Sequence, residues 1–464
     1  MPLTFAFAFK SLRDRASAWT GAFVMVAATS TLVAVVSSQL ETAILLPGDA
    51  GDVVRGYSLP MGLLALTVTA VVLPTVLSRT VSVQTRDYAL LRLAGATPRQ
   101  VRSLLSLQLV ILTFVALPVG LLVGYPAALL FFDFSSEQSA LLWYEELTYG
   151  VGTIIATTVV VVLFALLAGL GAARKAARAP ILVAVVDNVS ATRARRGSWI
   201  ARSCAAGLGV VVAVGLVWFS FGLSGGTIST TILNVLGLGA LALFSVTLAV
   251  AAVASLILPT LTRAWTRVVP SRSATWLLAR RAVQAQLAAT SSGVLPLFVS
   301  LTLVGGVFSL LWTADAAFVA AGRLSEGQSA TNVGGVLLIL CGGLFIAAVG
   351  AAVSILVASR DRQREYTMRR AIGEPAKGTI GSAIAESFIF VTSSVILAML
   401  VIAFVVTVTA LSMSHYVGPI AARFELGMPA VIASVGFALI ALVVIPPAIH
   451  ALRETDIGSS LSSD

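Results

Sequence analysis

Charged residues are scarce in this chain of 464 residues, of which 11% are Asp, Glu, Lys or Arg and 58% are hydrophobic. A soluble globular protein has about 25% charged and about 45–50% apolar residues. The shortage of charge therefore excludes an ordinary soluble enzyme, a secreted domain and a disordered protein. The mean hydropathy of +0.99 favours a polytopic membrane protein whose solvent is the bilayer.

Cysteines and catalytic motifs are also scarce. Cys204 and Cys341 are the two cysteines, and both lie inside apolar runs. This excludes a disulfide framework and a CxxC metal site, and we expect two small buried residues. The sequence contains no GxxxxGK[ST] motif for ATP phosphates, no Ser-His-Asp arrangement and no cluster of metal ligands. We therefore expect no catalytic residue, no metal site and no cofactor in this chain.

Long apolar stretches, in contrast, are abundant. A helix needs about 20 apolar residues to cross about 30 Å of hydrocarbon. We predict ten membrane helices, at residues 17–39, 58–81, 104–131, 149–172, 199–223, 228–261, 291–313, 333–358, 379–411 and 427–449. The expected fold class is an all-α polytopic membrane protein.

The basic residues lie almost entirely on one side of these ten spans. Of the 30 Lys and Arg residues, 27 fall in the terminal segments and in the loops on the same side. The opposite side holds Arg55, Arg323 and Arg423. By the positive-inside rule the first side is cytoplasmic, and so are both termini. The net charge of +10 is then a consequence of topology, and we expect no nucleic-acid partner. The outer loops 40–57 and 314–332 are too short to build a hydrophobic core.

The chain contains an internal repeat. Residues 86–95 and 364–373 align at an offset of 278, with Arg, an acid, Tyr, Arg and Gly in register. Gln108 and Glu386 follow at matching places. We infer two parallel four-helix units at 1–185 and 270–464, joined by residues 186–269 with two spans, which gives a 4+2+4 arrangement.

The first copy of the repeat reads Asp87-Tyr88-Ala89-Leu90-Leu91-Arg92-Leu93-Ala94-Gly95-Ala96-Thr97. This segment, between the second and third helices of a four-helix unit, resembles the FtsX-like permease domain. The second copy keeps Glu365, Arg370 and Gly373 but has Glu374-Pro375-Ala376-Lys377 in place of Ala-Thr-Pro-Arg. The layout is similar to the ten-span permeases of the MacB-like, or type VII, ABC transporter group.

The resemblance implies a permease of the bacterial plasma membrane that is not itself an ATPase. ATP and Mg would be bound by partner ABC ATPase subunits, and two repeats in one chain imply two such subunits per permease. The helical spacing of Tyr88, Leu91 and either Ala94 or Gly95 places them on one face. The residues expected to couple the permease to the ATPases are Arg86, Asp87, Tyr88, Leu91, Arg92, Gly95, Ala96, Thr97, Arg364, Glu365, Tyr366, Arg370, Gly373 and Glu374.

Two functions fit such a permease. The first is an ATP-driven exporter that expels or extracts a hydrophobic or amphipathic substrate, such as an antibiotic, an antimicrobial peptide or a lipid. The second is a transmembrane signalling or mechanical module that regulates cell-envelope enzymes, against which the short outer loops argue. An ion-coupled carrier would need charges near the middle of the bilayer, and we place only Glu386 inside a long apolar run.

Overall fold

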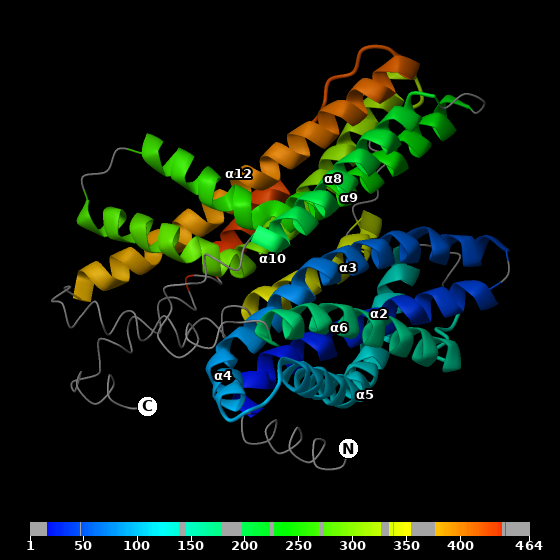
Figure 1. Ribbon diagram of the computed structural model, residues 1–464. Helices are drawn as coiled ribbons and strands as arrows, with labels where there is room; N and C mark the ends of the chain where they lie inside the picture. Colours follow the sequence, from blue (N-terminus) through cyan, green and yellow to red (C-terminus); the bar gives the residue numbers. More distant parts are fainter. Residues whose placement is uncertain are drawn as a thin grey trace. The chain divides into compact units, whose positions relative to one another are not determined.

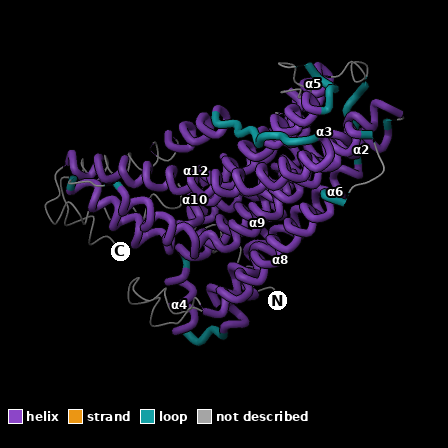
Figure 2. The backbone as a smooth tube through the Cα atoms, turned by 90° about the horizontal axis from the view of Figure 1, so that it is seen from above, coloured by secondary structure: helices purple, strands orange, loops and turns teal. Residues whose placement is uncertain are grey.

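The computed structural model describes residues 16–46, 48–138, 145–177, 196–222, 227–269, 273–325, 334–336, 338–353, 376–438 and 441. These residues are almost entirely helical, and no strand occurs among them (Figures 1 and 2). The labelled helices are α2 (Ala16–Leu45), α3 (Gly48–Val83), α4 (Thr85–Leu93), α5 (Pro98–Gln138), α6 (Val151–Ala177), α8 (Arg196–Ser220), α9 (Ile228–Val268), α10 (Ala274–Ala320) and α12 (Ala376–Val417).

Within the described residues, seven helices are long and apolar enough to cross a membrane. Three shorter apolar helices are Ala206–Ser220, Leu338–Val353 and Gly427–Ala438. These helices lie at the ten predicted positions, so the all-helical membrane fold is confirmed. That all ten helices cross the membrane stays a prediction. Because lipid offers no hydrogen bonds, the backbone must satisfy its own polar groups, which a helix does along its length.

The predicted outer loop at 40–57 is wrong. Helix α2 continues to Leu45 and α3 begins at Gly48, so the connection is reduced to residues 46 and 47. The predicted loop at 314–332 also starts as helix, since α10 ends at Ala320. Charged residues such as Glu41 and Asp49 end the hydropathy signal there, but they do not end a helix.

The chain divides into two compact units, which are described separately. Unit 1 comprises residues 1–200 and 332–353, and unit 2 comprises residues 201–331 and 354–464. This division differs from the sequence repeat, because helix Leu338–Val353 stands in the second repeat but packs in unit 1.

In unit 1, α2 packs against α3, α5 and α6. A Cβ on Gly120 of α5 would lie 2.2 Å from the Cβ of Ser30, so the two helices meet closely there. Helix Leu338–Val353 packs through glycines in the same way. A Cβ on Gly343 would lie 1.7 Å from Leu64, and one on Gly350 would lie 2.0 Å from Val72. Small residues of this kind allow membrane helices to approach closely.

In unit 2, α9, α10 and α12 pack against one another. Helix α8 approaches α9 where a Cβ on Gly209 would lie 2.9 Å from Ala249. Helix Gly427–Ala438 approaches α10 where a Cβ on Gly436 would lie 2.5 Å from Leu297. Close packing at small residues therefore occurs within each of the two units.

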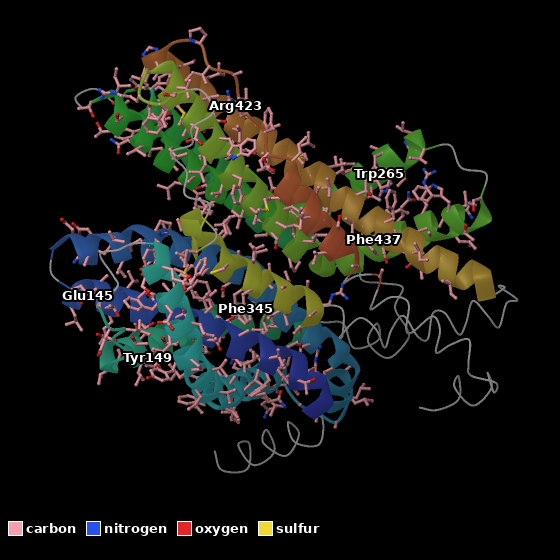
Figure 3. All side chains as sticks on the ribbon, turned by 180° about the vertical axis from the view of Figure 1, so that it is seen from behind. Glu145, Tyr149, Trp265, Phe345, Arg423 and Phe437 are labelled. Carbon is pink, nitrogen blue, oxygen red and sulfur yellow. The ribbon has the colours of Figure 1, made fainter. Side chains whose placement is uncertain are left out.

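Both units contain the same tether, a hydrogen bond from a backbone N–H of a connecting segment to a threonine near the end of a helix. In unit 1, Thr42 near the end of α2 accepts a hydrogen bond from the backbone N–H of Thr148 at 2.9 Å. In unit 2, Thr313 near the end of α10 accepts one from the backbone N–H of Arg423 at 3.2 Å. Arg423 lies at the end of unit 2 opposite Trp265, and Tyr149 marks the corresponding end of unit 1 (Figure 3). The shared tether supports two repeats of the same direction.

The next helix begins differently in the two units. In unit 1, the Glu41 carboxylate of α2 accepts hydrogen bonds from the backbone N–H groups of Gly150, Gly152 and Thr153, at 2.8–3.1 Å. In unit 2, Glu425 accepts hydrogen bonds from the backbone N–H groups of Gly427 at 2.9 Å and Met428 at 3.3 Å. Each carboxylate satisfies N–H groups that a helix start leaves open.

Candidate functional site

The candidate site is the short helix α4, which stands between the ends of α3 and α5 at one end of unit 1 (Figure 1). The sequence places these nine residues in a basic connection, where the repeat predicted a functional element. The structure makes them a helix and turns Tyr88 and Ala89 inward, each 4% exposed. The connection is therefore a packed helix rather than an extended loop.

A left-handed glycine ends α4. Gly95 has φ of +99°, its N–H donates to the carbonyl of Arg92 at 3.1 Å, and the N–H of Ala96 donates to that of Leu91 at 3.0 Å. These two bonds form a Schellman motif, which satisfies the last carbonyls of a helix. Since side chains other than glycine are strained at this φ, the position explains the glycine predicted there.

A capping box begins α5 only two residues later. Thr97 Oγ1 accepts from the N–H of Gln100 at 3.3 Å, and Gln100 Oε1 accepts from the N–H of Thr97 at 2.8 Å. Pro98 occupies the first helical position, where its missing N–H costs nothing. The segment from Leu91 to Gln100 is thus a helix stop followed directly by a helix start, which fixes the corner between α4 and α5.

A buried polar cluster joins α4 to its N-cap residue Gln84, which directly follows α3, and to α5. The Tyr88 hydroxyl donates to Gln84 Oε1 at 2.7 Å, and its oxygen lies 3.2 Å from Gln108 Oε1 on α5. Gln84, at the end of α3, is 4% exposed and Gln108 is 2% exposed. Because buried hydrogen bonds of this kind are lost only at a cost, they hold Tyr88 of α4 to the start of its own helix and to α5.

Two leucines of α4 face outward among the side chains that the structure describes in this helix. Leu90 is 51% exposed and Leu93 is 60% exposed, three residues apart on the helix. Leu91 and Arg92 are partly buried. Among the described side chains of α4, the exposed apolar pair is therefore Leu90 and Leu93, with Arg92 between them in the sequence.

The structure brings the predicted residues of the first copy together. Tyr88, Leu91 and Arg92 lie in α4, and Gly95, Ala96 and Thr97 form the corner after it. Arg86 and Asp87 belong to α4, with side chains outside the described part of the chain. The six residues predicted from the second copy also lie outside it: Arg364, Glu365, Tyr366, Arg370, Gly373 and Glu374.

Sequence reasoning missed four residues of this site: Gln84, Leu90, Leu93 and Gln100. All four have a local signal. Leu90 and Leu93 are spaced i, i+3, the pattern Thr-Pro-Arg-Gln from Thr97 to Gln100 is a capping box, and Gln84 precedes Tyr88 by one helical turn. The contact between Tyr88 and Gln108 depends on tertiary packing and has no local signal.

Glu386 on α12 occupies the place that Gln108 holds on α5, and it is also buried, with 1% exposure. The two matching polar positions of the repeat are therefore both internal. Among the described residues, no group of three or more His, Cys, Asp or Glu side chains is placed to hold a metal ion.

The sequence profile of the FtsX-like permease C-terminal domain matches residues 61–181 and 337–455, which is just over half of the chain. The chain belongs to the FtsX-like permease family. The first matched region contains α4, its two corners, α5 and α6, and the second contains the other copy of the repeat. A search of curated proteins gives no match. Members of this family are membrane transport components that work with ABC ATPase partners, so the chain is an integral membrane protein of that kind.

Proposed function

We propose that this chain is the membrane subunit of an ATP-driven ABC exporter in the bacterial plasma membrane, with both termini in the cytoplasm. The observation that carries the proposal is α4, a helix with an exposed Leu90–Leu93 pair that is fixed between two membrane helices. An exposed apolar pair on a basic cytoplasmic connection suits a partner groove, and Arg92 can pair with an acid beside it.

The proposed mechanism transmits ATPase movement through buried contacts. Two partner subunits bind ATP and Mg and close on one another, since the chain has no phosphate-binding motif of its own. The closure displaces α4, and Tyr88 passes the displacement to Gln84, which directly follows α3, and to Gln108 on α5. The corner at Gly95 and Thr97 keeps α4 and α5 in register. Residues 364–374 serve the second subunit.

The proposed substrate is hydrophobic or amphipathic: an antibiotic, an antimicrobial peptide or a lipid. Unit 1 supports this choice at its outer end, where α2 and α3 are joined by only two residues. Such a connection cannot form an outer domain that would regulate an envelope enzyme, which makes signalling the weaker alternative. The 4+2+4 arrangement of ten spans completes the proposal.

The count of subunits tests the proposal. Native mass spectrometry of the detergent-solubilised complex should give one permease with two ATPase subunits, because the chain holds two copies of the coupling repeat. A particle with two permeases and two ATPases, or a permease that never copurifies with an ATPase, would overturn it.

The capping box at Thr97 and Gln100 is replaced by Pro375 and Gly378 in the second copy. Arg92→Glu and Arg370→Glu should therefore reduce ATPase stimulation to different extents.

A further inference from the structure

A pocket of about 180 Å³ lies between α5 and α6 in unit 1. Its lining is apolar, and it follows one stripe of each helix at spacings of three and four residues. The principal lining residues are Ser106, Val110 and Phe114 of α5 and Val162, Leu166 and Leu170 of α6. A cavity of about 150 Å³ with apolar walls holds a molecule as large as benzene, so this pocket accepts a short length of hydrocarbon chain.

The close approach of the helices at Gly169 gives the pocket its shape. A Cβ on Gly169 would lie 2.5 Å from Leu109 Cδ1, so α5 and α6 meet there. Beside this contact, Phe114 is 64% exposed and Leu166 is 38% exposed. The pocket is therefore open on the outside of unit 1.

The pocket lies within one leaflet of the bilayer. The apolar span of α6 is Val151–Gly171, 21 residues, about the length that crosses the hydrocarbon once. The lining residues from Val162 to Leu170 occupy the half of this span that is farther from Val151. That half is on the side where α5 begins, which is the cytoplasmic side in the proposed orientation.

Two arginines lie below the pocket on the same face of α5. Arg102 and Arg99 precede the lining residue Ser106 by four and seven residues, the spacings at which helical side chains share a face. They stand about 6 Å and about 10 Å from Ser106 along the helix axis. Arg99 is exposed and Arg102 is partly exposed. Positive charge therefore stands at headgroup level beneath an apolar pocket at acyl-chain level.

We propose that this pocket binds one acyl chain of an anionic phospholipid from the cytoplasmic leaflet, with the phosphate of its headgroup held by Arg99 and Arg102. The arginines favour an anionic over a zwitterionic lipid. A peptide would leave its backbone amides without partners against these apolar walls. The assignment rests on the proposed orientation of the chain and is independent of export.

Photocrosslinking in vesicles tests the site. The full chain is reconstituted into phosphatidylcholine vesicles that contain a trace of phosphatidylglycerol with a diazirine on its acyl chain. After illumination, labelled peptides are mapped by mass spectrometry. We expect labels to concentrate on the pocket residues of α5 and α6, and the same probe on phosphatidylcholine to label them at least fivefold less.

Variants on both walls define the pocket. Val110→Phe and Val162→Phe fill it from α5 and α6 and should each remove most of the labelling. Val115→Phe and Val159→Phe are matched controls, because these valines are 55% and 60% exposed and do not line the pocket. Using both walls guards against one variant that fails to fold.

Charge variants define the headgroup contact. Arg99→Gln and Arg102→Gln should each lower the preference for phosphatidylglycerol about fivefold, as expected for one basic residue at the surface. Arg267→Gln on α9 in unit 2 is the charge-matched control and should leave labelling of α5 and α6 unchanged.

Three outcomes would overturn the assignment: equal labelling by both lipids, labels spread evenly over all apolar surfaces, or equal loss in the pocket and control variants. None of these readouts uses ATP or a partner subunit. A failure of the lipid site is therefore distinguishable from a failure of the proposed export function.

Discussion

Gly95 offers the sharpest test of how α4 works, because its backbone and its surroundings make different demands on a side chain. Its φ of +99° lies where side chains other than glycine are strained. A Cβ added there would have nothing within 4 Å. Substitution therefore perturbs the backbone of the corner and creates no steric clash with the rest of the unit.

The expected magnitude follows from this separation. A residue with a side chain costs about 1–2 kcal/mol in the left-handed region, and Asn less than others because its side chain bonds locally. A β-branched residue costs more than Ala. A cost of 1–2 kcal/mol shifts an equilibrium about 5–30-fold. The fraction of molecules that keep the native turn between α4 and α5 should therefore decrease from Gly95→Asn to Gly95→Ala to Gly95→Val.

The assay is stimulation of the partner ATPase by the purified permease, measured for Gly95→Asn, Gly95→Ala and Gly95→Val. We expect stimulation to decline in that order, with the midpoint of thermal unfolding of the permease nearly unchanged. Gly56→Val is the matched control. Gly56 lies within α3 and also has nothing within 4 Å of an added Cβ, but its φ is not positive.

Equal stimulation by the Asn and Val variants would refute the reasoning, because the backbone of Gly95 would then have no role in coupling. An equal loss in Gly56→Val would refute it in another way, by showing that any added side chain on the permease disturbs the complex.

Three further predictions follow from the structure. Tyr88→Phe should leave ATPase binding intact but lower ATPase stimulation, because the buried Gln84 Oε1 loses a hydrogen-bond donor, at about 1–3 kcal/mol; a pull-down compared with an ATPase assay separates the two effects. Gly343→Leu should destabilise the permease in thermal unfolding, since an added Cβ alone would lie 1.7 Å from a neighbouring leucine side chain. In a chain whose native cysteines are replaced by serine, cysteines at Glu137 and Ser325 should react with an impermeant thiol reagent on intact cells, and one at Ser190 should not.

Each of these predictions has its own control. Tyr125→Phe, at another tyrosine of unit 1, should leave ATPase stimulation unchanged. Gly56→Leu, in open space on α3, should barely alter the unfolding midpoint. Permeabilised cells should allow all three engineered cysteines to react. If Ser190 reacts in intact cells while Glu137 does not, the chain has the reverse orientation.

The sequence predicted the membrane helices well, because a bilayer demands long apolar helices and the hydropathy pattern records that demand directly. The ends of helices were predicted less well. The stretch 40–57 contains Glu41, Asp49 and Asp52, which lower its hydropathy and favour a loop, yet most of this stretch is helix. Glu41 explains why: its carboxylate binds the start of α6, a tertiary contact that hydropathy does not record.

The prediction that both cysteines are buried was wrong. Cys204 and Cys341 are exposed on their helices. In a soluble protein an apolar run points to the interior, but in a membrane the surface facing lipid is equally apolar. Apolar sequence therefore predicts membrane depth without predicting which face of a helix contacts protein. A glycine is more informative about packing, as at Gly120 of α5, where an added Cβ would lie 2.2 Å from the Cβ of Ser30.

The position of helix Leu338–Val353 changes how the two repeats are understood. The repeat assigns this helix to the second copy, but Gly343 and Gly350 bring it against Leu64 and Val72 of α3 in unit 1. Such contacts cannot form unless the first copy is already in place, so the second copy does not complete its packing alone. The sequence repeat therefore shows which segments resemble one another, whereas the packing shows which helices are held together.

The chain leaves unit 1 after Val353 and enters unit 2. Residues 364–374, which we propose as the second coupling segment, follow this boundary. In the proposed mechanism, a displacement of that segment acts along the chain on a helix of unit 1 before it and on α12 of unit 2 after it, whereas a displacement of α4 acts on α3 and α5, which both belong to unit 1. This difference is a second physical reason, beside the missing capping box, to expect unequal effects from Arg92→Glu and Arg370→Glu.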